Sequence, residues 1–118
     1  MQEPLPKVER TVHLRVPPAD LWRHLVDGEL ASLWVGGQMT IEPRLNGRVT
    51  LRTEGAPETF GTVEEIINGQ AITWTWRTAD GEPTQVTLRL EDSDDGCHLT
   101  VTEEMLHYEI VIVPPTFA

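Results

Sequence analysis

The stretch that decides the fold spans residues 68–96 and reads NGQAITWTWRTADGEPTQVTLRLEDSDDG. Its two long runs, 70–78 and 84–92, alternate apolar and polar residues, a pattern typical of strands with one buried face. Asn-Gly and Asp-Gly pairs predict type I′ hairpin turns, because such turns need positive φ at both central residues. Three pairs bound the runs: Asn68-Gly69, Asp80-Gly81 and Asp95-Gly96. The stretch therefore predicts consecutive antiparallel hairpins.

The same pattern extends in both directions along the chain, with a further turn signal at Asn46-Gly47. Within 59–67, Phe60 and Ile66 fall on one parity and Val63 and Ile67 on the other, which predicts a bulge. The sequence predicts a β-meander with a first strand before it, about seven strands in all. Their ranges are 8–16, 38–45, 48–54, 59–67, 70–78, 84–92 and 97–103.

Two short helices are predicted between the first two strands. Pro17-Pro18 ends the first strand, and Pro18 suits the first position of a helix. Leu21, Trp22, Leu25 and Val26 form one apolar stripe, after which Gly28 is expected to be a left-handed C-cap. A shorter helical spacing, Leu30, Leu33 and Trp34, is ended by Gly36-Gly37. The fold class is therefore α+β.

One parity of the predicted sheet is apolar and the other is polar, as in an antiparallel sheet that is covered on one side only. The apolar parity comprises Val49, Leu51, Ile72, Trp74, Trp76, Val86, Leu88, Leu90, Cys97, Leu99 and Val101, with Val8, Val12, Leu14 and Val16 on the first strand. The polar parity comprises Thr73, Thr75, Arg77, Thr87, Arg89, Glu91, His98, Thr100 and Thr102.

Bulk properties narrow the class of protein. With 118 residues, we expect one domain over residues 1–118. The net charge of −10 disfavours nucleic acid and anionic membrane surfaces as partners. The lone cysteine, Cys97, cannot form an internal disulfide, and no signal peptide or membrane span is recognisable, so a cytoplasmic protein is expected.

Candidate catalytic groups are sparse. His13, His24, His98 and His107 lack the spacing of metal ligands on a helix, so neither a metal nor a cofactor is predicted. Adjacent residues on a strand point to opposite faces, so Glu64-Glu65 and Glu103-Glu104 should not act as carboxylate dyads. Ser32 and Ser93 have no histidine in a suitable context, and Cys97 is expected to be an inert core residue.

The arrangement resembles the START-like helix-grip (SRPBCC) superfamily and, within it, the bacterial domains named after the activator of Hsp90 ATPase. The resemblance covers a core of residues 8–103. It is carried by 16–22 (VPPADLW), 33–34 (LW), 60–66 (FGTVEEI), 73–76 (TWTW) and 99–102 (LTVT). It implies a curved sheet that grips a C-terminal helix around a hydrophobic cavity. Residues 104–118 form an atypical tail without that helix, and we expect Tyr108–Val113 to form a β-like segment that could mediate a homodimer.

The resulting hypothesis is non-enzymatic binding of a hydrophobic small molecule in the concave groove. A protein-interaction module of the co-chaperone kind is the alternative, and a cyclase-like enzyme using Glu103 or His107 is a third. No catalytic residue is predicted. The residues predicted to line the ligand site are Trp34, Met39, Leu51, Trp74, Trp76, Leu88, Leu99, Val101 and Glu103.

Overall fold

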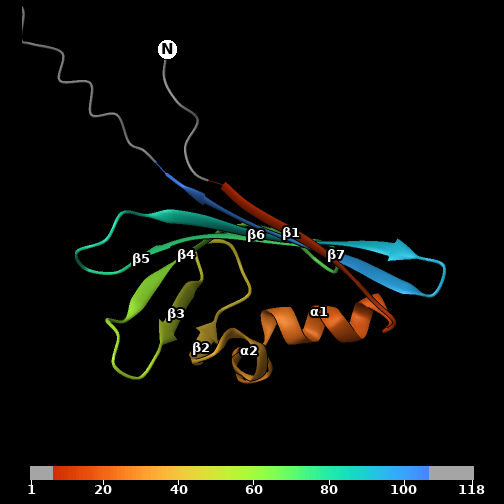
Figure 1. Ribbon diagram of the computed structural model, residues 1–118, viewed down its shortest axis with the longest axis horizontal. Helices are drawn as coiled ribbons and strands as arrows, with labels where there is room; N and C mark the ends of the chain where they lie inside the picture. Colours follow the sequence, from red (N-terminus) through yellow and green to blue (C-terminus); the bar gives the residue numbers. More distant parts are fainter. Residues whose placement is uncertain (1–6, 107–118) are drawn as a thin grey trace, which may run out of the picture.

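The computed structural model describes residues 7–106, apart from the side chain of Trp34. It contains seven strands with two helices between the first and second strands (Figure 1). The strands are β1 (Lys7–Leu14), β2 (Gln38–Ile41), β3 (Arg48–Arg52), β4 (Thr59–Ile67), β5 (Ala71–Arg77), β6 (Thr84–Ser93) and β7 (Gly96–Met105). The helices are α1 (Pro18–Val26) and α2 (Gly28–Val35).

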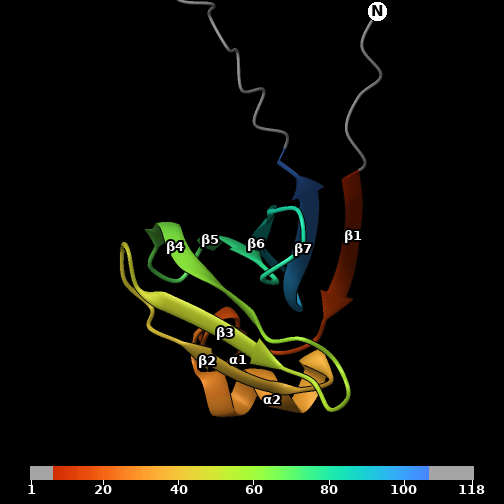
Figure 2. The same ribbon diagram turned by 90° about the vertical axis from the view of Figure 1, so that its left-hand side faces the viewer.

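All seven strands form one antiparallel sheet in the order β1-β7-β6-β5-β4-β3-β2. β2 to β7 follow one another as a meander, and β1 returns to pair with β7. The sheet curls into a half-barrel, and the two helices lie within its curve (Figures 1 and 2). The α+β meander predicted from the sequence is therefore confirmed. The predicted tail segment 108–113 lies outside the described residues.

One aspartate joins the two helices. Pro18 occupies the first turn of α1, as predicted, and Trp22 and Leu25 are its buried side chains. Asp27 ends α1 in an extended conformation and caps α2, where its carboxylate accepts a hydrogen bond from the Leu30 N–H at 3.1 Å. The prediction that Gly28 is a left-handed C-cap is wrong. Gly28 begins α2, and an added Cβ would lie 2.6 Å from the Met39 carbonyl oxygen of β2.

The core lies between the concave face of the sheet and the helices. Trp22, Leu25 and Ala31 from the helices pack with the inward side chains of the strands. These inward side chains include Val49, Val63, Ile72, Trp74, Val86, Leu88, Leu90, Cys97 and Leu99. The predicted apolar parity of β3 and β5 to β7 is thus the buried one.

The outer face of the sheet is polar, and hydroxyl pairs cross between strands. Thr11 bonds to Thr100 at 3.0 Å, and Thr73 bonds to Thr87 at 3.1 Å. Such cross-strand pairs contribute modestly to sheet stability.

The bulge predicted in β4 is present, because the register with β5 shifts between Val63 and Glu65. This shift leaves Glu64 and Glu65 both exposed, so the expectation that these neighbours point to opposite faces fails at this point. A bulge adds one residue to one strand and breaks the strict alternation of faces.

The positions of the turns were predicted well, but their type was not. Among the described residues other than glycine only Asn46 has positive φ, and Gly47 does not share it, so none of the four pairs forms a type I′ turn. At the β4–β5 turn, only Gly69 has positive φ, and the Gln70 N–H donates to the Ile67 carbonyl. At the β6–β7 turn, Ser93 pairs with Gly96, so the two turn residues are Asp94 and Asp95.

Candidate ligand-binding groove

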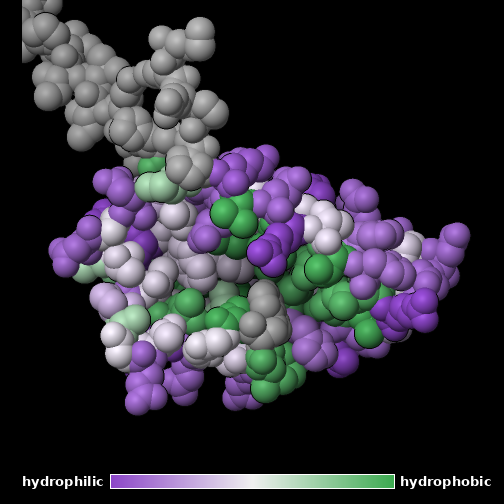
Figure 3. All heavy atoms as spheres, in the orientation of Figure 1, coloured by the Kyte–Doolittle hydropathy of each residue, from purple (hydrophilic) through white to green (hydrophobic). Residues whose placement is uncertain are grey.

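The concave face of the sheet contains a hollow of about 290 Å³ beside α2. Hydrophobic side chains gather in the space between the sheet and the helices (Figure 3). The lining residues come from α2, β3, β5, β6 and β7, and all but one are apolar: Val35, Leu51, Trp74, Trp76, Val86, Leu88, Val101 and Glu103. We call this hollow the groove.

Six of the nine predicted site residues line the groove: Leu51, Trp74, Trp76, Leu88, Val101 and Glu103. Leu99 is buried in the core and is not part of the lining. Met39 is also buried and borders a different hollow on the outer face. The side chain of Trp34 is not among those described, so its predicted role in the site is not tested.

Val35 and Val86 line the groove but were not among the predicted site residues. The alternation of Val86 with Leu88 and Leu90 was sufficient to place it on the concave face. Val35 is the last residue of α2, and its position depends on how the helix packs against the sheet. A local sequence pattern does not contain that information.

The two tryptophans of β5 form the aromatic part of the groove. Their ring centroids are 5.5 Å apart with an interplanar angle of 69°, an edge-to-face arrangement that is favourable for aromatic pairs. Trp74 is 2% exposed, whereas Trp76 is only partly buried. The Trp74 Nε1–H is buried and has no hydrogen-bond partner within the described part of the chain.

A row of directly paired residues crosses the concave face of the sheet. Trp74 lies opposite Val86, Val86 lies opposite Glu103, and Glu103 lies opposite Val8 of β1. Adjacent strands are about 4.8 Å apart, so the backbones of Trp74 and Glu103 lie roughly 10 Å apart along this row. The groove therefore runs from a buried indole to a carboxylate.

Glu103 marks the exposed rim of the groove. The sequence placed it on the same parity as Leu99 and Val101, and it does lie on the concave face, but its side chain is exposed. The Thr84 hydroxyl donates a hydrogen bond to its carboxylate at 3.2 Å. The carboxylate at the rim opposes an anionic group on a ligand, although solvent screens this repulsion.

Beyond the rim, the concave face continues onto β1 without cover from the described residues. Val8 is 60% exposed and Val12 is 46% exposed. Arg10 lies between them, opposite Val101 of β7, and is also exposed. We call Val8, Arg10 and Val12 the β1 strip.

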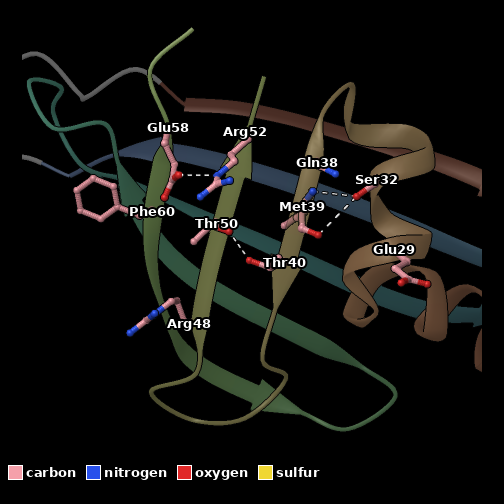
Figure 4. A pocket seen from close by; sticks show the side chains of 10 residues that line it. All are labelled: Glu29, Ser32, Gln38, Met39, Thr40, Arg48, Thr50, Arg52, Glu58 and Phe60. Atoms are coloured by element: carbon pink, nitrogen blue, oxygen red, sulfur yellow. Dashed lines mark hydrogen bonds and ion pairs between the residues drawn. The ribbon is translucent and has the colours of Figure 1, made fainter. Parts of the chain in front are cut away.

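A larger hollow, of about 800 Å³, lies on the other side of the sheet over β2, β3 and β4 (Figure 4). Several of its polar side chains bond to one another or to the backbone. Arg52 pairs with Glu58 at 2.8 Å, the hydroxyls of Thr40 and Thr50 bond, and Ser32 bonds to the Met39 backbone. This hollow is open and lined mainly by polar and charged side chains, so it offers an apolar small molecule less than an apolar groove does.

A serine, a histidine and an aspartate meet on the outer face, an encounter that the sequence did not predict. His13 Nε2 lies 2.8 Å from Asp95 Oδ1 and 3.3 Å from Ser93 Oγ, and the His98 ring packs 4.9 Å from that of His13. The sequence showed no histidine in a suitable context for Ser93, and the structure places His13 within 3.3 Å of its hydroxyl. A catalytic triad needs the acid and the serine on different imidazole nitrogens, whereas here both contact Nε2.

Two ionisable groups elsewhere in the described residues, Glu42 and Cys97, have altered pKa values. Hydrogen bonds from the Arg44 side chain and the Arg48 backbone N–H lower the pKa of the Glu42 carboxyl. Burial raises the pKa of the Cys97 thiol, and the Asp92 charge adds to this effect. A buried thiol with a raised pKa is a poor nucleophile, as expected for a core cysteine. Residues 7–106 contain no cluster of three or more potential metal ligands.

A family model described as "Activator of Hsp90 ATPase homolog 1-like protein" matches residues 15–112. The chain belongs to this family. The resemblance predicted from the sequence is thus confirmed. A search of curated proteins found no match to this member of the Hsp90 ATPase activator-like family. No helix within the described residues has the length and apolar composition needed to cross a membrane.

Several solved structures share the fold of this family member. One is a protein from Mesorhizobium loti, with a TM-score of 0.80 and 20% identity, covering 86% of this chain and 78% of that one. An HSP90 activator from Plasmodium falciparum has a TM-score of 0.70 and 20% identity, covering 86% and 74%. The Aha1 dimer from Colwellia psychrerythraea has a TM-score of 0.73 and 13% identity, covering 88% and 79%. At these identities the likeness concerns the fold.

Proposed function

We propose that this protein binds a neutral, apolar small molecule in the groove and does so without catalysing a reaction. The observation that carries the proposal is the groove itself: an apolar lining, two aromatic rings and one polar group at the rim. Small-molecule sites are typically concave and mostly apolar, with a few polar groups that fix orientation, and they measure about 300–1,000 Å³. The groove lies at the small end of this range.

The size of the groove sets the expected affinity. A two-ring aromatic molecule with about twelve non-hydrogen atoms, at about 0.5 kcal/mol per atom, would gain about 6 kcal/mol on binding. This free energy corresponds to a Kd of some tens of micromolar. Catalysis is not part of the proposal, because Glu103 is the only ionisable side chain that lines the groove and it has neither a base nor a nucleophile beside it among the described lining residues.

Filling the groove from within should abolish binding. Val101 faces the groove, whereas its neighbour Thr100 is on the outer face, so Val101→Phe and Thr100→Phe add the same bulk on opposite sides of one strand. With 2-ethylnaphthalene as the probe and equilibrium dialysis as the measurement, we expect Val101→Phe to weaken binding at least tenfold. Thr100→Phe should change the Kd by less than about twofold.

The same pair of variants shows when the proposal fails. It is wrong if the wild-type protein does not retain the probe at concentrations up to its solubility, or if the two variants weaken binding equally. Circular dichroism of both variants establishes that each is folded before the Kd values are compared.

A second candidate function is association with another copy of the chain through the β1 strip. Exposed Val8 and Val12 support it, and they lie on a strand whose outer edge has no partner strand among residues 7–106. Such edges favour strand addition by a second chain.

We expect the wild-type protein to sediment as a dimer, and the Val8→Lys/Val12→Lys double variant to sediment as a monomer. A wild-type protein that is monomeric at a concentration of about 100 μM would exclude this role, since a stable dimer has a dissociation constant well below that concentration.

A further inference from the structure

One of the side chains that line the groove, Trp74, carries a buried donor without a partner in the described part of the chain. The Trp74 Nε1–H is the only buried side-chain nitrogen or oxygen within the described residues that makes no hydrogen bond. Buried indole N–H groups usually find an acceptor, because an unpaired buried donor has lost its water without compensation. The missing component is therefore a hydrogen-bond acceptor for this N–H.

The described side chains around Trp74 offer this donor no strong hydrogen-bond acceptor. Directly across the sheet from it lie Val63 on β4 and Val86 on β6, whose side chains hold no acceptor. Apart from the two tryptophans, the rest of the lining is aliphatic up to Glu103, whose carboxylate is bonded by Thr84 at the rim. Trp76 presents an aromatic ring at a steep angle, which is at best a weak acceptor.

We propose that the ligand of the groove carries a hydrogen-bond acceptor, such as a carbonyl oxygen, that binds the Trp74 Nε1–H at the floor of the groove. This inference rests on the proposed function and adds the chemical class of the ligand. The ligand is flat and neutral: its acceptor end meets the indole, and its other end points to the Glu103 carboxylate two strands away. A fatty-acid-like anion fits poorly, because no cationic side chain is among the described residues that line the groove.

Binding must also rearrange the aromatic pair. The Trp74 nitrogen has almost no exposed surface, so an acceptor reaches it only after the neighbouring side chains shift. Trp76 is partly exposed and touches Trp74 edge to face, which makes it the side chain best placed to move. Side-chain rotations of partly exposed residues are fast compared with ligand binding.

Two probes of nearly equal shape isolate the acceptor. 2-Acetylnaphthalene has a carbonyl oxygen where 2-ethylnaphthalene has a methylene group. By equilibrium dialysis of the full chain, we expect the ketone to bind about tenfold more tightly than the hydrocarbon, which is about 1.4 kcal/mol. In Trp74→Phe this ratio should fall to about one. In the matched control, Trp22→Phe, it should stay near tenfold, because Trp22 is buried in the core and does not line the groove.

A second readout needs only the wild-type protein and covers the case in which Trp74→Phe does not fold. In two-dimensional ¹⁵N–¹H spectra, the assigned Trp74 indole N–H should move downfield when 2-acetylnaphthalene is added and not when 2-ethylnaphthalene is added. Movement of this signal with the ketone alone supports the proposal.

The outcomes separate the two claims. If both probes bind equally and the Trp74 indole signal responds alike to each, the acceptor proposal is overturned while groove binding stands. If neither probe binds, groove binding fails, and the acceptor proposal fails with it.

Discussion

Replacing Ile72 with alanine is expected to lower the free energy of unfolding by about 4 kcal/mol, the upper part of the range for deleting a large buried aliphatic side chain. Ile72 is fully buried in β5, opposite Ile66 on β4 and Leu88 on β6, at the centre of the concave face. The cavity left behind cannot easily close, because the strands on both sides are fixed by their own hydrogen-bond ladders. Urea denaturation followed by circular dichroism measures the change.

Ile67 provides the matched control. It lies at the end of β4, five residues before Ile72 in the sequence, but is 39% exposed. Ile67→Ala removes the same atoms from a partly solvated position and should cost less than about 1 kcal/mol. Equal losses for the two variants would contradict the assignment of the concave face as the core.

Replacing Gly61 with alanine is expected to lower the free energy of unfolding by about 3 kcal/mol, the upper part of the range for overpacking. Gly61 lies in β4 between Val49 and Trp76, and the strands approach so closely that an added Cβ would collide with the Thr75 carbonyl oxygen and lie 2.6 Å from the Trp76 Cα. The backbone of β5 must move away, which also displaces the Trp76 ring from the groove.

Thr62→Ala is the control for Gly61→Ala. Thr62 is the next residue of β4 and is exposed on the other face, so its truncation should cost less than about 1 kcal/mol. Thermal unfolding of the two variants side by side measures the difference. A Gly61→Ala protein as stable as the Thr62→Ala protein would mean that the close approach of β4 and β5 is not required.

Much of the fold could be predicted because it depends on patterns local to each strand. The alternation in residues 70–78 and 84–92 identified both the strands and their buried face, and the change of parity at Val63 predicted the bulge. The turn type could not be predicted, because a glycine permits positive φ without requiring it. Gly28 illustrates this: close approach to Met39 explains it, rather than a left-handed cap.

The site was only partly predictable, for a related reason. The alternation of apolar and polar residues along the strands was enough to place Trp74, Trp76 and Val101 on the concave face. Contacts between distant segments were not visible, as with Val35 of α2 facing the groove or His13 meeting Ser93. The unpaired Trp74 N–H was not predictable either, since the absence of a hydrogen-bond partner depends on all the side chains that pack around the ring.

The most direct test of the central claim is to map where a small apolar molecule binds, using ¹⁵N–¹H amide shifts of the full chain titrated with 2-acetylnaphthalene. The account predicts saturable shifts concentrated in β5, β6 and β7 around the groove, together with the indole N–H signals of Trp74 and Trp76. Shifts concentrated over β2 to β4 on the outer face, or no saturable shifts, would contradict it.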